Sequence, residues 1–102
     1  MPEAFSNKKL IAEMLDSSQI LAELALSRLS NLSSSDLEIL KQSWEKTDTE
    51  RRRQVISQLL HLSQTNFRLD FSPIFFFCLH DPDPKVRATA ILGLAEEEDY
   101  LH

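Results

Sequence analysis

The side chains best suited to chemistry gather in two short segments, ERRRQ at 50–54 and HDPDPKVR at 80–87. Guanidinium groups bind carboxylates and phosphates through paired hydrogen bonds, so Arg51 and Arg53 are candidates for contact with an acidic partner or an anion. Acidic residues lie just before them in the sequence and can screen both charges. We therefore favour the simpler interpretation of a solvated helix start, in which Arg52 has a structural role.

The other reactive residue types form no catalytic or metal-binding pattern. Cys78 is the single cysteine and lies in an apolar segment, where we expect an inert, buried thiol. His61, His80 and His102 lack carboxylates or cysteines at the spacing of metal ligands. A glycine-rich phosphate loop cannot form around Gly93, because it is the only glycine. The sequence therefore predicts a protein that is not an enzyme and that uses neither a metal nor a cofactor.

Composition narrows the class of protein further. The chain has 102 residues, of which 42% are apolar, and this suits one globular domain over 1–102. Its formal net charge of −5 disfavours nucleic-acid binding, because an acidic protein repels phosphate backbones. A single cysteine fits a reducing compartment, which we expect to be the cytoplasm. We expect no membrane contact, since no signal core and no run near the ~20 apolar residues of a spanning helix is present.

Apolar residues recur at three- and four-residue steps along nearly the whole chain, which predicts an all-α fold. Ser35 and Glu38 have the spacing of a capping box, and Asp48 has the position of a helix cap. Pro84 is expected at the first position of the last helix, where the lack of an amide hydrogen costs little because that hydrogen would have no partner within the helix. A single bent helix in place of the first two is the alternative. The six predicted helices span residues 6–15, 18–31, 35–46, 49–64, 70–79 and 84–97.

The third and fourth predicted helices align with the fifth and sixth when the sequence is shifted by 35 residues. The alignment matches apolar positions, and it also matches Asp48 to Asp83 and Arg52 to Arg87 without a gap. An internal repeat of this kind predicts helix pairs that stack and bury their apolar faces against one another. The first pair is degenerate, because no aspartate aligns at its turn. The predicted pairs span residues 1–31, 35–64 and 70–97.

The segment LHDPDPKVRATAILGL at 79–94 resembles the turn and second helix of a HEAT repeat. The pattern of that family is Leu-x-Asp-x-Asp-Pro-x-Val-Arg, followed by alanine and leucine at helical spacing. The preceding pair departs from it, with Lys46 in place of the first aspartate and Arg51 in place of the valine. Helix pairs of the tetratricopeptide type have a similar spacing, but the proline-flanked aspartates fit HEAT better.

The resemblance implies a HEAT-like superhelix of stacked antiparallel pairs, similar to bacterial HEAT-like proteins of unassigned role. It also implies that the first aspartate of the turn hydrogen-bonds the arginine of the preceding repeat. Asp81 would then lie near Arg52, and Arg87 would face whatever follows. The residues carried over as structural turn positions are Asp81, Asp83, Pro84, Arg87 and Arg52.

We expect a scaffold or adaptor that presents a helical surface to another protein, whose identity the sequence does not give. The alternatives are a HEAT-like enzyme or nucleic-acid-binding module, similar to DNA glycosylases or chromophore lyases, and a structural module that assembles only with itself. A homodimer through an uncovered end repeat is a further expectation. The candidate partner surface consists of Arg51, Arg53, Gln54, Ser57, His61, Phe76 and Thr89.

Overall fold

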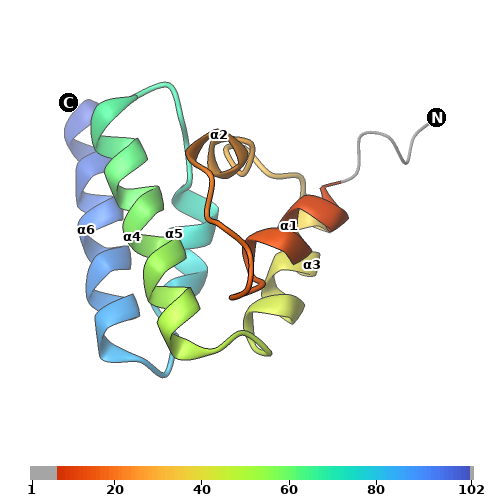
Figure 1. The fold of residues 1–102 in the computed structure, drawn as a ribbon. Coiled ribbons are helices and arrows are strands. Elements are labelled where there is room, and N and C mark those ends of the chain that lie inside the picture. The colour runs from red at the N-terminus through yellow and green to blue at the C-terminus, as the bar shows by residue number, and fades with distance from the viewer. Residues whose placement is uncertain (1–6, 102) are drawn as a thin grey trace.

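Six helices build the part of the chain that the computed structural model describes, residues 7–101, with side chains described for residues 7–95 (Figure 1). The predicted all-α fold is confirmed over this range. The predicted helix start at residue 6 lies outside the described residues. None of the described helices is both long and apolar enough to cross a membrane. The helices are α1 (Lys8–Met14), α2 (Glu23–Ser27), α3 (Ser34–Trp44), α4 (Thr49–Thr65), α5 (Ser72–Cys78) and α6 (Pro84–Leu101).

Helices α5 and α6 form a tight hairpin whose turn follows from its aspartates and prolines. Proline occupies the first turn of α5 and the first position of α6, where a helix has no partner for the missing donor. The Asp83 carboxylate accepts a hydrogen bond from the Val86 backbone amide at 3.0 Å and so caps α6. The predicted start of α6 is confirmed, and this helix continues four residues beyond its predicted end. Helix α5 begins at Ser72, the second of the two starts, Asp70 or Ser72, that the sequence allows.

Gly93 allows the two helices of this hairpin to approach closely. A Cβ atom added at Gly93 would lie 2.5 Å from ring carbons of Phe75, which is fully buried on α5. Glycine in a helix interior costs about 1 kcal/mol relative to alanine, so its presence needs such a packing reason. The ring of Phe75 supplies that reason.

Helices two positions apart in the chain pack side by side. Helix α4 packs against α2 and α6, while α3 packs against α1 and α5. Helices α4 and α6 run in the same direction (Figure 1). The odd-numbered helices therefore contact one another in chain order, as do the even-numbered helices, whereas α3 and α4 make at most a slight contact with each other.

The first pair is shorter than predicted. The second helix was expected over 18–31, but α2 covers only five residues, and Ile20 is 94% exposed before it begins. The Asp16 carboxylate accepts hydrogen bonds from the backbone amide and the hydroxyl of Ser18, at 3.0 and 2.7 Å. Such local bonds compete with helix formation, so two short helices form in place of one bent helix.

The predicted capping box of α3 is wrong. Ser33, not Ser35, occupies the cap position, and its hydroxyl accepts a hydrogen bond from the Asp36 amide at 3.2 Å. Three consecutive serines offer the same cap chemistry, and the sequence pattern alone could not choose among them. The predicted cap of α4 is confirmed, since the Asp48 carboxylate accepts from the Arg51 amide at 3.1 Å.

A direct contact ties the end of the first pair to the start of the third. Asn31 has a left-handed backbone with φ of 57°, and its amide donates to the Asp70 carbonyl oxygen at 3.0 Å. The Asp70 amide donates in turn to the Ser30 hydroxyl at 2.7 Å. The chain therefore closes a contact across the middle pair.

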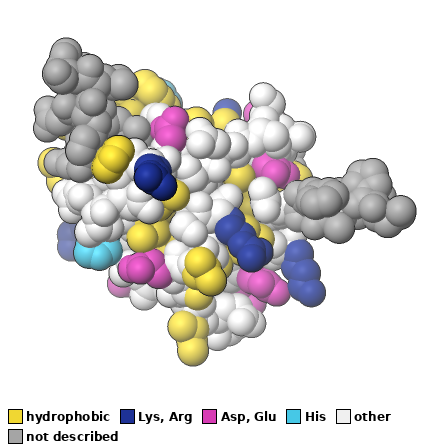
Figure 2. All heavy atoms as spheres, turned by 90° about the horizontal axis from the view of Figure 1, so that it is seen from above, with side chains coloured by type: hydrophobic (Ala, Val, Ile, Leu, Met, Phe, Trp, Pro, Cys, Tyr) yellow, Lys and Arg dark blue, Asp and Glu magenta, His cyan; other side chains and the backbone are white. Residues whose placement is uncertain are grey.

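One core runs through all six helices, and the molecule is globular in shape. The radius of gyration is 12.9 Å, against about 13 Å for a compact domain of this length. Hydrophobic side chains nevertheless reach the surface, as the view from the α2 side shows (Figure 2). Burial departs from the repeat alignment at one position, since Ile56 is fully buried but the aligned Ile91 is 58% exposed.

Candidate functional site: a hollow beside the Asp81 turn

The carboxylate of Asp81 is the centre of a buried polar cluster that joins α3, α4 and the turn before α6. Its Oδ2 atom accepts a hydrogen bond from Nε1 of Trp44 at 2.7 Å. Its Oδ1 atom accepts from the Asp83 amide at 2.9 Å and from Nη2 of Arg52 at 3.4 Å. Asp81 therefore uses both of its oxygens inside the protein.

The predicted proximity of Asp81 and Arg52 is confirmed. Nε of Arg52 lies 3.1 Å from Oδ2 of Asp81, a distance for an ion pair, although its geometry does not meet that of a hydrogen bond. The guanidinium also donates to the Thr47 carbonyl oxygen. Both side chains are almost completely buried, so removing either one would leave an uncompensated charge.

A second ion pair joins the same two elements. Nε and Nη2 of Arg53 donate to the two oxygens of Asp83, at 2.9 and 2.6 Å, in the fork geometry typical of arginine and carboxylate. These hydrogen bonds hold the pKa of Asp83 well below its ordinary value, at about 2. Arg53, one of the residues predicted for a partner surface, is half-buried, and its guanidinium pairs with Asp83 within the protein.

Arg51 is likewise not part of an outward surface. It is only 4% exposed, and its Nε atom donates to the Met14 carbonyl oxygen at 2.8 Å, where α1 ends. The cause is the first helix pair, which covers the start of α4 and places the end of α1 over this side chain. The prediction of a solvated Arg51 is therefore wrong.

Arg87 turns back onto its own turn. Its Nη1 atom donates to the carbonyl oxygens of Asp81 and Pro82, at 2.8 and 3.1 Å. Arg52, the aligned residue one pair earlier, donates to a carbonyl oxygen five residues back in the same way. Among the described residues, no carboxylate pairs with Arg87, whereas Asp81 pairs with Arg52.

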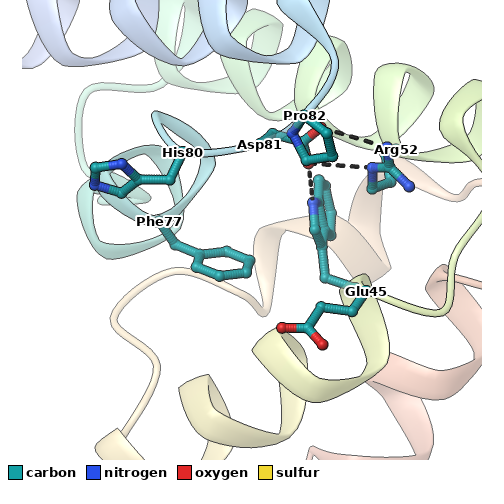
Figure 3. A pocket seen from close by; sticks show the side chains of 7 residues that line it. Glu45, Arg52, Phe77, His80, Asp81 and Pro82 are labelled. Atoms are coloured by element: carbon teal, nitrogen blue, oxygen red, sulfur yellow. Dashed lines mark hydrogen bonds and ion pairs between the residues drawn. The ribbon is translucent and has the colours of Figure 1, made fainter.

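A hollow of about 210 Å³ lies directly beside the Asp81 cluster (Figure 3). Phe77 points across it toward Trp44, and the two rings meet edge to face with centroids 6.4 Å apart. Lys41 lies 5.8 Å from the centroid of the Phe77 ring. The residues that line the hollow are Trp44, Glu45, Arg52, Phe77, His80, Asp81 and Pro82.

The walls of this hollow are mostly apolar, and its rim is polar. The polar groups of Trp44, Arg52 and Asp81 form a hydrogen bond and an ion pair with one another. Glu45 and His80 are exposed at the rim and can contact a bound group. The arrangement therefore suits an apolar or aromatic side chain with a polar neighbour.

The remaining predicted surface residues do not form one site with the hollow. Gln54, Ser57 and His61 are exposed along α4, as predicted, while Thr89 is only half exposed on α6. Phe76 is 60% exposed on α5. It directly precedes Phe77 in the sequence but is not among the residues that line the hollow.

The single cysteine and the metal-binding residue types are the other reactive side chains. Cys78 is fully buried, and burial raises the pKa of its thiol to about 12, so it carries no nucleophilic thiolate at neutral pH. Within residues 7–95, no three His, Cys, Asp or Glu side chains come together in a way that could hold a metal ion. His102 lies outside the described residues.

Sequence reasoning missed the polar role of Trp44 and the pair between Arg53 and Asp83. The sequence predicts a packed core role for Trp44, since it aligns with Leu79, with a stacking or cofactor role as the alternative. The alignment could have suggested a hydrogen bond, because a buried tryptophan usually needs an acceptor for its N–H group.

Comparisons with protein-family models, with curated proteins and with solved structures found no match for the chain.

Proposed function

We propose that this protein is an interaction module, HEAT-like in its stacking of helix pairs, that binds another protein and catalyses no reaction. The hollow between Trp44 and Phe77 carries the proposal. Its volume of about 210 Å³ is below the roughly 300–1,000 Å³ of ordinary small-molecule pockets. It has room for one apolar side chain, and a protein partner can supply such an anchor.

Phe76 supports a protein as the occupant. Phe76 is 60% exposed and directly precedes Phe77, which lines the hollow, so it can add apolar area beside the hollow. Interfaces draw most of their free energy from a few anchors of this kind, surrounded by a polar rim. Glu45 and His80 provide the polar rim here.

The arginine cluster gives little support to the rival proposal of nucleic-acid binding. The guanidinium groups of all three arginines, Arg51, Arg52 and Arg53, form hydrogen bonds or ion pairs within the protein. Phosphate recognition would need free basic side chains on a surface, and the net charge of −5 opposes it as well. A cytoplasmic location belongs to the proposal and rests on the use of a single cysteine.

Site-specific photocrosslinking in the native host tests the proposal. A photoreactive amino acid is placed at His80 on the rim of the hollow, at His61 on α4, or at Ala12 on α1 as an exposed control. We expect a discrete crosslinked protein from position 80 and not from position 12. Adding Phe76→Ser to the position 80 variant should reduce the yield, because an apolar anchor contact is lost.

The outcomes separate the two candidate surfaces. Capture from position 61 alone would move the binding surface to α4 and remove the hollow from the proposal. Equal labelling from all three positions would mean nonspecific contact and would contradict the proposed function.

A further inference from the structure

We propose that α6 carries a second interaction surface, on which two copies of this chain pair through antiparallel α6 helices. The proposal does not depend on the hollow, which involves other residues. It begins with an apolar stripe on the side of α6 that faces away from the core. The exposed residues of this stripe are Ala88, Ile91, Leu92 and Ala95.

The spacing of the stripe is that of a helix–helix seam. Its members recur at three- and four-residue steps, the pattern with which one helix buries a face against another. Ile91 and Leu92 are 58% and 56% exposed, so two large aliphatic side chains lie together at the centre of the stripe. Alanines one turn to either side keep the flanks small and allow a second helix to approach.

Comparison with α4 indicates that the apolar face of α6 is suited to contact with protein and not with solvent. The 35-residue alignment places Leu92 at the position of Ser57, which is exposed on α4. It also places Ala88 at the position of Arg53, which pairs with Asp83 of the following helix pair. The stripe thus has an apolar residue where α4 meets water and lacks one of the arginines that α4 uses to hold α6.

The lack of an arginine at position 88 of α6 also indicates which kind of partner fits this helix. Suppose that a further helix pair docked on α6 in the way that α6 docks on α4. Its turn would bring two carboxylates, but α6 has only one arginine, Arg87, to pair with the first of them. A second copy of α6 needs no such carboxylate, because the stripe would pack against itself. Isologous pairing of one patch with itself is the commonest way in which soluble proteins form dimers.

The charges along α6 favour an antiparallel second copy. Lys85 and Arg87 lie in the first turn, and residues 96–99 are all acidic in the sequence and fall in the last turns of the helix. An antiparallel partner centred on Ile91 and Leu92 brings position 85 opposite position 98. Basic and acidic ends then face each other at both edges of the seam.

The helix dipole adds to this preference. Acidic residues at the C-terminal end of a helix are unfavourable because the dipole is negative there. Antiparallel pairing sets the positive end of the partner helix beside them and offsets this cost. The charge sequence of α6 is therefore better suited to the dimer than to an isolated helix.

Sedimentation equilibrium of the full chain tests the proposal, over concentrations from about 1 µM to about 1 mM. We expect a monomer–dimer equilibrium with a dissociation constant of roughly 1–100 µM, as a small interface would give. The double change Ile91→Ser and Leu92→Ser should weaken the dimer at least about tenfold. Ser57→Ala, at the aligned exposed position of α4, is the matched control and should leave it unchanged.

A charge-reversal experiment tests the antiparallel orientation. Lys85→Glu alone and Glu98→Lys alone should each weaken self-association, because like charges then face each other across the two-fold axis. An equimolar mixture of the two variants should form a heterodimer, in which opposite charges meet at both ends. Circular dichroism of each variant verifies that the helices remain folded.

Several outcomes would overturn the proposal. A wild-type chain that stays monomeric up to the highest concentration ends it, as does a dimer that is insensitive to the double serine change. A mixture of charge variants no tighter than either alone excludes the antiparallel orientation. Loss of the dimer in Phe76→Ser would move the interface to the hollow. That last outcome would also predict a crosslink between two copies of the chain from position 80, whereas the other outcomes leave the crosslinking test of the hollow unaffected.

Discussion

Asp81 connects consecutive helix pairs, because each of its hydrogen-bonding partners belongs to a different element of the structure. Trp44 belongs to α3, Arg52 belongs to α4, and the Asp83 amide belongs to the turn before α6. A buried carboxylate is costly unless each of its lone pairs finds a donor, and here the donors come from sequence positions up to 37 residues away. The cluster therefore fixes the relative placement of the pairs more than it adds net stability.

Replacing Asp81 with Asn should lower the free energy of unfolding by about 3–5 kcal/mol, because it leaves the buried guanidinium of Arg52 without a counter-charge. Urea unfolding at neutral pH, followed by Trp44 fluorescence, measures the loss. The double change Asp81→Leu with Arg52→Met serves as the control. It removes both charges and should cost clearly less than Asp81→Asn; an equal cost would show that packing, not charge, dominates.

Asp83 should make the stability of the protein sensitive to acid. Its pKa is about 2 in the folded protein, chiefly because of hydrogen bonds from Arg53, whereas an unfolded aspartate titrates near ~3.9. The folded state therefore binds fewer protons than the unfolded state between these values. The contribution of Asp83 is fully present above about pH 4 and is lost as the pH falls toward 2.

Thermal unfolding between pH 5 and about pH 2 measures this dependence. Asp83→Asn retains a residue that can cap α6 but cannot titrate, so its stability should fall less steeply with acid than that of the wild type. Arg53→Gln removes the main cause of the low pKa and should flatten the curve similarly. Parallel curves for all three proteins would contradict the assignment.

At the scale of single elements, the sequence predicted helices best where their ends have special residues. The turn into α6 has two aspartates and two prolines, and its start is confirmed. Three serines precede α3, and there the predicted cap was wrong by two residues. The extent of α2 was wrong because hydrophobic spacing continues through 18–31, whereas local side-chain bonds end the helix early.

The same limit applies to the site. The contact between Asp81 and Arg52 was foreseen from the HEAT-like pattern and is confirmed. The burial of Arg51 was not, because it depends on where α1 ends in space, and no local pattern around residue 51 encodes that position. The hollow escaped prediction for a similar reason, since Trp44 and Phe77 come from helices that meet only in the fold.

Gly93→Ala should destabilise the hairpin of α5 and α6. The added Cβ atom would meet the buried ring of Phe75, and overpacking of this kind costs about 1–3 kcal/mol. Alanine gains about 1 kcal/mol in helix propensity, so the net loss should be about 0–2 kcal/mol. Chemical denaturation measures it, with Gln58→Ala at the aligned exposed position of α4 as a control that should change stability by less than about 0.5 kcal/mol. A gain in stability would mean that Phe75 can move aside.

At the scale of the whole molecule, stability should be unevenly distributed. Helices α1 and α2 have seven and five residues, whereas α4 has 17 and buries side chains along its whole length. Short helices with few buried side chains open at low cost, while core helices open only with the whole protein. We therefore expect two classes of backbone amide in the folded state.

Native-state hydrogen exchange measures this difference. Amides of α2 should exchange at least about tenfold faster than those of α4. The Asn31 amide is the informative exception, because it donates to the Asp70 carbonyl and should be protected as strongly as α5. Exchange of Asn31 at the rate of α2 would mean that this contact opens together with the first pair.

The contact between Asn31 and Asp70 has a consequence for how such a chain could evolve. Arrays whose units touch only their immediate neighbours can be lengthened by copying a unit in tandem. Here Ser30 and Asn31 hold the backbone at Asp70 directly, across one intervening helix pair. In a tandem duplication of residues 35–69, a copy of Ser35 would take the place of Asp70 in the chain. Because the contact uses only the backbone amide and carbonyl groups at this position, a copied pair could keep the contact only by packing against the first pair as the residues after Asp70 now do. An added pair is therefore tolerated only if it repeats this placement.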